Sequence, residues 1–238
     1  MNWLDTYKSQ PPAFVDLTHT EFKELLDLEL TPVMRERGLT YDGRYTWYGE
    51  MNNSMRKSIS AYLLKSGAIF RWAITFDFIP WVSGNRLVYS RTEKNIFAHL
   101  YEYPHDFYAA SESWEAQERW ANSTCRMTQM ALDGIQKIID SIHTAFAHDL
   151  KWFDKWHSEF NTIDDALRMV NAKIMPHGEL MYYNFYPSPV YIKAFLLAAT
   201  DNKEEGRCLL QRHFEHEHIY LSWSDDIKNK LLKKLDDV

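Results

Sequence analysis

Residues 70–78 read Phe-Arg-Trp-Ala-Ile-Thr-Phe-Asp-Phe, and this stretch decides the fold. Large apolar side chains alternate with smaller or charged ones, which is the two-residue period of a β-strand. The sequence therefore predicts a strand over residues 68–79, with two distinct faces. One face is expected to carry Phe70, Trp72, Ile74, Phe76 and Phe78, and the other Arg71, Ala73, Thr75 and Asp77.

The neighbouring segments share this two-residue period. Further strands are predicted over residues 41–50, 57–65 and 95–103. Ser66-Gly67 leaves room only for a tight turn, so the strands on either side of it are expected to form a hairpin. Ser83-Gly84-Asn85 predicts another turn, followed by a short strand over 86–90. Consecutive strands with short links form antiparallel sheets, and we expect four to five strands here.

A helix is predicted before the sheet, over residues 18–37. Thr18 and Glu21 have the spacing of a capping box, and Phe22, Leu25, Leu26 and Leu30 recur at helical spacing. Pro32 is expected to kink this helix or restart it, and Gly38 to cap its end. The apolar side of the helix is expected to cover one face of the sheet.

The second half of the chain has a helical pattern. Residues 113–157 predict one long helix or two, with possible breaks at 122–124 or at Gly134. Further helices are predicted over 163–173, 190–200, 204–216 and 225–235. The fold class is therefore α+β: an N-terminal helix packed on an antiparallel sheet, followed by an all-helical C-terminal half. We expect two regions, 1–105 and 106–238, packed together as one compact unit.

Length and composition exclude several classes of protein. The longest uninterrupted apolar run, residues 194–199, has six residues, far fewer than the roughly 20 that span a bilayer. The N-terminal sequence has no basic segment followed by an apolar one, so no secretory signal is expected. The chain has two cysteines without CxxC spacing, which favours a reduced, cytoplasmic protein.

The charge distribution bears on the partner. The net charge is -6, and residues 1–105 carry 12 basic and 12 acidic side chains, whereas residues 106–238 carry 15 basic and 21 acidic ones. This balance argues against nucleic acid and favours a basic protein partner, because opposite charges steer encounter. Four acidic candidates for the contact are Asp164, Asp165, Glu204 and Glu205. An acidic first turn of a helix explains the aspartate pair equally well.

Aromatic residues are abundant, at 36 in total. Trp47 and Tyr48 are neighbours on one predicted strand, so alternation places them on opposite faces. Trp81 follows the strand over 68–79. Exposed Trp and Tyr anchor protein interfaces, and we take Trp47, Tyr48 and Trp81 as candidate contacts. Base stacking is the alternative use, although it requires interleaved Lys and Arg.

Motifs for catalysis or cofactors are missing. The sequence contains no GxSxG, GxGxxG or Walker motif, so we predict no catalytic residue and no cofactor. The run 213–218 contains His213, His216 and Glu217 at spacings of three and four residues, which would let them share a helix face and hold a metal. This spacing differs from HExxH, and a polar helix end explains the run without any metal.

Four segments together resemble a known family. They are residues 22–26, 33–43, 45–48 and 72–77: a helix, a glycine-plus-apolar step, a strand opening with an aromatic run, and a later strand. This pattern resembles the bacterial domain-of-unknown-function 4304 family over residues 18–103. Leu39-Thr40 stands where that family has Phe-Lys, and Phe76-Asp77-Phe78 replaces its glycine-ended strand. The resemblance implies a small toxin-neutralising or defence protein, and it supplies no catalytic residue.

These observations together predict a non-enzymatic bacterial protein-binding protein. The favoured role is an immunity protein that neutralises a cognate toxin through an acidic and aromatic surface. One alternative is a metal-dependent hydrolase built on residues 213–218. Another is an adaptor in a defence complex that uses the helical hairpin over 189–216.

Overall fold

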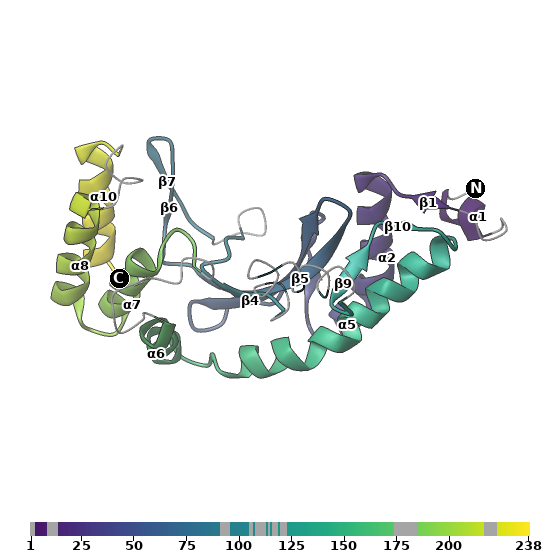
Figure 1. Cartoon of the computed structure of the whole chain (residues 1–238). Helices are drawn as coiled ribbons and strands as arrows, with labels where there is room; N and C mark the ends of the chain where they lie inside the picture. The colour runs from purple at the N-terminus through teal and green to yellow at the C-terminus, as the bar shows by residue number, and fades with distance from the viewer. Residues whose placement is uncertain are drawn as a thin grey trace. The chain divides into compact units, whose positions relative to one another are not determined.

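The structure is a computed structural model with an α+β fold (Figure 1). It describes residues 3–8, 14–90, 96–104, 123–173, 185–216 and 223–238, together with residues 107, 113, 115 and 119. The chain forms two compact units. Unit 1 contains Met1–Gly49, Ser58–Trp72 and Glu102–Lys155, and unit 2 contains Glu50–Lys57, Ala73–Tyr101 and Trp156–Val238.

The units interleave along the chain instead of following each other. Strands β4 (Met55–Leu64) and β5 (Gly67–Phe76) and helix α5 (Ile135–Ser158) each continue from one unit into the other. The boundaries therefore differ from a division at residue 105. The charges also divide differently: unit 1 carries 17 acidic and 12 basic side chains, and unit 2 carries 16 and 15. The excess of negative charge belongs mainly to unit 1.

The main sheet has six strands in the order β2-β3-β4-β5-β8, and β9 pairs with β5 outside this path. The bounds of the other strands are β2 Thr40–Tyr41, β3 Thr46–Tyr48, β8 Leu100–Glu102 and β9 Arg126–Thr128. Strands β4 and β5 are neighbours on either side of Ser66, so the predicted hairpin is confirmed. Gly67 pairs with Thr128, and a Cβ on Gly67 would lie 2.0 Å from the carbonyl oxygen of Met127. Only glycine permits this approach of β9.

Helix α2 (His19–Glu36) follows the sequence closely. Thr18 and Glu21 form the predicted capping box. At the other end the N–H of Gly38 donates to the Arg35 carbonyl, and the N–H of Leu39 donates to the Met34 carbonyl. Gly38 has a φ of 74°, so this end is a Schellman motif. The helix passes through Pro32 without ending there, which corrects the expected restart.

The region before α5 contains strands where a helix was predicted. Strands β9 and β10 (Met130–Ala131) occupy residues 126–131, and α5 begins directly after Gly134, one of the two expected breaks. Within unit 1, α5 packs on β5 through Phe146 against Phe70 and Phe153 against Trp72. Residues from both faces of β5 are buried, including Ala73 and Thr75. Both faces are therefore covered along β5, whereas the sequence predicted only a helix over one face of the sheet.

Two short elements complete unit 1. Strand β1 (Val15–Asp16) pairs with β10 as a two-stranded ribbon, and α1 (Trp3–Lys8) precedes it. The sequence pattern predicted neither element, because both are too short for a recognisable period. Figure 1 shows them at the purple end of the chain.

Unit 2 combines a β-ribbon with helices. Strands β6 (Trp81–Ser83) and β7 (Arg86–Val88) form the predicted turn at Gly84. The helices are α6 Ile163–Lys173, α7 Pro189–Ala199, α8 Lys203–His216 and α10 Asp225–Asp236, close to the predicted ranges. Gly206 lets α7 and α8 approach, since a Cβ there would lie 2.4 Å from the Ala194 carbonyl oxygen. No helix in the described part of the chain is both long and apolar enough to cross a membrane.

Candidate functional site

A pair of stacked aromatic rings lies at the surface of unit 2. The ring centroids of Trp81 and Tyr186 are 4.3 Å apart, and the ring planes differ by 29°. Trp81 is half-buried and Tyr186 is 40% exposed. Neighbouring Val82 is buried, so β6 alternates between an outward Trp81 and an inward Val82. We call Trp81 and Tyr186 the aromatic platform.

Hydrogen bonds to backbone carbonyl groups anchor the residues next to both rings of the platform. The N–H of Tyr186 donates to the His99 carbonyl at 3.0 Å, and Phe185 forms an antiparallel bridge with Leu100. On the Trp81 side, the hydroxyl of buried Tyr191 donates to the carbonyl of Pro80 at 2.8 Å. The residues next to both rings are thus fixed to β8 and α7. Two rings held in this way lose little conformational entropy when a partner packs on them.

His99 is a buried, uncharged support for this region. Its Nδ1 accepts a hydrogen bond from the N–H of Phe76 at 2.9 Å, so Nδ1 carries no proton and Nε2 does. Burial lowers the pKa of His99 to about 3, against a smaller opposing effect of the Ile79 backbone. His99 is therefore neutral at physiological pH. Burial also raises the pKa of Tyr186, which stays a neutral phenol.

His213 lies away from the surface. Its Nε2 is 3.1 Å from Ser188 Oγ, and both side chains are buried. Ser188 also accepts from the N–H of Tyr191 and so caps α7. Across the described residues, no group of three or more His, Cys, Asp and Glu side chains is placed to hold a metal ion. The side chain of His216, and Glu217 altogether, lie outside the described residues.

The four acidic candidates all belong to unit 2, at the starts of two helices. Asp165 accepts from the N–H groups of Asn161 and Thr162 at 3.1 and 2.9 Å, and it pairs with Arg168. These bonds, first that of Asn161, lower the pKa of Asp165. Asp165 is therefore a helix cap. Asp164 in α6, and Glu204 and Glu205 in α8, are exposed in the first turns of their helices.

Trp47 and Tyr48 are both buried, at 0% and 6% exposed. Both were predicted as candidate contacts on opposite faces of a strand, but β3 is an inner strand of the sheet and both side chains are covered. Trp47 Nε1–H donates to Thr31 Oγ1 of α2 at 2.9 Å, and its ring stacks on Tyr41. Trp47 therefore joins helix to sheet within unit 1 and presents no surface to a partner.

Tyr186 was not among the predicted contacts, although residues 182–186 read Tyr-Tyr-Asn-Phe-Tyr and are rich in aromatic side chains. Nothing in the sequence pairs that run with β6, more than 90 residues earlier. A sequence signal for Tyr186 is its place directly before Pro187-Ser188-Pro189, where α7 begins. No protein-family model, curated protein or solved structure matches this chain.

Proposed function

We propose that this chain is a non-enzymatic protein-binding protein that uses the aromatic platform of unit 2 as the centre of its interface. The observation that carries the proposal is the stacking of Trp81 on Tyr186, partly exposed and anchored through backbone hydrogen bonds. Binding energy in protein interfaces concentrates on a few Trp, Tyr and Arg side chains. Rigid rings of this kind provide large contact area at low entropic cost.

The partner class follows from charge. Unit 2 is close to neutral as a whole, with 16 acidic and 15 basic side chains, but it exposes Asp164, Glu204 and Glu205 in the first turns of two helices. A basic protein would be steered toward such a surface, with the aromatic platform providing most of the affinity. The specific role that we propose is bacterial immunity: neutralisation of a cognate basic toxin by covering its active surface.

The experiment is affinity purification from the native host at endogenous expression, followed by mass spectrometry and metal analysis. The full chain is compared with Trp81→Ala and with a matched control, Trp152→Ala. Trp152 is 48% exposed and lies in unit 1, so its removal deletes the same side chain from a different surface.

We expect one basic protein in stoichiometric amount with the unchanged chain and with Trp152→Ala, and its loss with Trp81→Ala. Equal recovery with all three proteins would contradict the role of the platform. A stoichiometric metal ion without any protein partner would contradict the proposed function and favour the histidine run at 213–218.

A further inference from the structure

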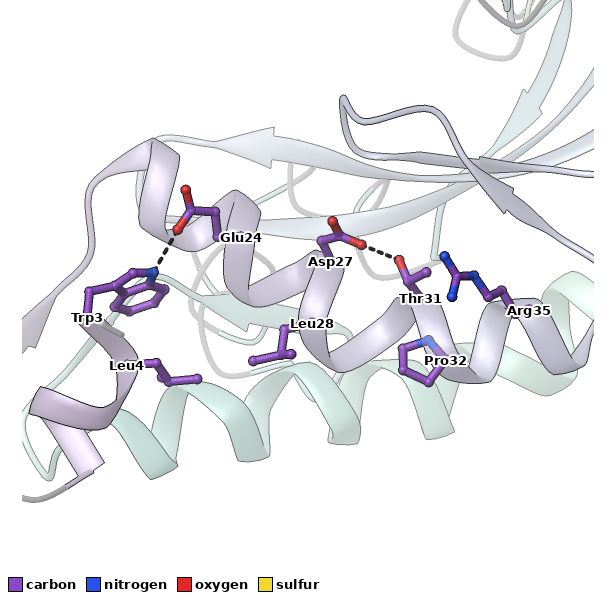
Figure 2. A pocket seen from close by; sticks show the side chains of 8 residues that line it. All are labelled: Trp3, Leu4, Glu24, Asp27, Leu28, Thr31, Pro32 and Arg35. Carbon is purple, nitrogen blue, oxygen red and sulfur yellow. Dashed lines mark hydrogen bonds between the residues drawn. The ribbon is translucent and has the colours of Figure 1, made fainter. Parts of the chain in front are cut away.

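A groove lies between α1 and α2 in unit 1, separate from the aromatic platform (Figure 2). Its volume is about 410 Å³, within the range of pockets that bind small molecules or single side chains. The residues that decide its chemistry are Trp3 and Leu4 from α1, and Glu24, Asp27, Leu28 and Arg35 from α2.

Glu24 and Trp3 hold each other in place. Trp3 Nε1–H donates to Glu24 Oε2 at 2.7 Å. Tryptophan is a neutral donor, so the carboxylate keeps its full negative charge. A carboxylate has sites for about four hydrogen bonds, which leaves Glu24 able to accept from an incoming donor.

The carboxylate of Asp27 is fixed by hydrogen bonds that connect it to the buried core. Thr31 Oγ1–H donates to Asp27 Oδ1 at 2.6 Å, and the same Oγ1 accepts from buried Trp47 Nε1 at 2.9 Å. These two hydrogen bonds fix the position of the Asp27 carboxylate without any ligand. Burial raises the pKa of Tyr41, and the Asp27 charge raises it further, so this negative charge acts on the surrounding side chains.

The two carboxylates are neighbours on one helix face, because residues three apart in a helix have Cβ atoms about 5–6 Å apart. Leu28, which is 53% exposed, and buried Leu4 supply apolar surface beside them. The face of an indole ring also attracts cations. Carboxylates, an indole ring and apolar surface together match a cation carried on an aliphatic stem.

We propose that the α1–α2 groove binds an organic cation, an ammonium or guanidinium group on a short apolar stem. The cation lies by Glu24, Asp27 and the Trp3 ring, and the stem lies on Leu4 and Leu28. Arg35 lines the same groove, and its guanidinium group lies next to Thr31, at the end opposite Trp3 and Glu24 (Figure 2).

A cationic group on a short apolar stem occurs both in a free alkylguanidine or alkylamine and in an arginine or lysine side chain of a protein. The test is an NMR titration of the full chain with n-butylguanidinium, with its neutral analogue n-butylurea, and with the peptide acetyl-Gly-Arg-Gly-amide. The signal to follow is the indole N–H of Trp3, assigned by its absence from Trp3→Phe.

We expect saturable shifts of the Trp3 signal with butylguanidinium and none with butylurea. Glu24→Gln and Asp27→Asn should each weaken binding at least fivefold. Both variants preserve an acceptor oxygen for the internal hydrogen bond, so the fold is retained. The control Glu36→Gln removes an exposed carboxylate from the same helix outside the groove and should change binding less than twofold.

Tighter binding of the peptide than of butylguanidinium would identify a protein side chain as the natural ligand, and weaker binding would identify a free cation; either result supports the site. Shifts with butylurea as large as those with the cation would overturn the proposal. Equal weakening by Glu36→Gln, or the lack of any saturable shift, would do the same. Trp81→Ala should leave this titration unchanged, so its outcome is independent of the aromatic platform.

Discussion

Unit 1 and unit 2 each place a tryptophan on a three-residue strand, and the two side chains have opposite environments. Trp47 lies in β3, between β2 and β4 in the main sheet, and it is 0% exposed. Trp81 lies in β6, which among the described residues pairs with β7 alone, and it remains half-buried. An inner strand of a large sheet can be covered on both faces, whereas a two-stranded ribbon leaves one face to solvent. The strand context, not the residue type, thus decides which tryptophan can meet a partner.

The largest expected effect tests the buried member of this pair. Trp47→Ala should lower the free energy of unfolding by about 3–5 kcal/mol, because it leaves a cavity and removes the hydrogen bond to Thr31. Urea denaturation followed by circular dichroism measures the change. A loss below about 1 kcal/mol would mean that Trp47 is not the core residue described above.

A smaller change isolates the hydrogen bond at Thr31. Thr31→Val retains the volume but deprives Trp47 Nε1 of its acceptor and Asp27 of its donor. We expect a loss of about 2 kcal/mol, the cost of a buried unpaired donor, in the same denaturation experiment. The matched variant Thr31→Ser keeps the hydroxyl and should lie closer to the original protein. Equal losses in the two variants would assign the effect to packing alone.

The third prediction concerns His99, beneath the aromatic platform. Its folded pKa, about 3, is below the usual 6.5, so between these values the unfolded chain binds the proton that the folded chain excludes. The His99 contribution to stability is complete above pH 6.5 and falls as the pH drops toward 3. From pH 6.5 to pH 5 we expect the free energy of unfolding to fall by roughly 1–2 kcal/mol.

His99→Asn is the control, because its amide oxygen can accept from the Phe76 N–H without titrating. This variant should show a flatter dependence of stability on pH over the same interval. An equal slope in both proteins would show that other groups cause the acid sensitivity.

The smallest stability effect is expected at the surface. Trp81→Ala removes one ring of the stacked pair and should lower the free energy of unfolding by about 1 kcal/mol or less. Thermal unfolding by calorimetry, with Trp47→Ala measured beside it, gives the contrast directly. If Trp81→Ala lowered the free energy of unfolding as much as Trp47→Ala, the distinction between a surface and a core tryptophan would be wrong.

The parts of the fold that follow a local pattern could be predicted from the sequence. The capping box at Thr18, the Gly38 end of α2, the hairpin around Ser66 and the helices α6, α7, α8 and α10 depend on neighbouring residues. Strands β9 and β10 could not be predicted, since each has three residues or fewer and gains its stability from distant partners. The restart expected at Pro32 does not occur, because this one proline lies inside a helix of 18 residues whose other contacts hold it.

The candidate site was partly accessible to sequence reasoning. Trp81 could be named because it is an aromatic residue that follows the predicted strand over 68–79, although Trp47 and Tyr48 were named on the same general ground. Its stacking on Tyr186 depends on the pairing of residues more than 100 positions apart, which no local pattern encodes. The burial of Tyr48 and Trp47 likewise depends on which strands flank β3. The site thus required the tertiary structure.

The most direct test of the central claim is a double-mutant cycle on the purified complex with the captured partner. Isothermal titration calorimetry gives the Kd for the unchanged chain, Trp81→Ala, Tyr186→Ala and the double variant. We predict that each single variant weakens binding about 30-fold, or about 2 kcal/mol, and that the double variant is little weaker than either one, because the stacked rings act as a unit. Binding that is unchanged in Trp81→Ala, or reduced no more than in Trp152→Ala, would contradict the account.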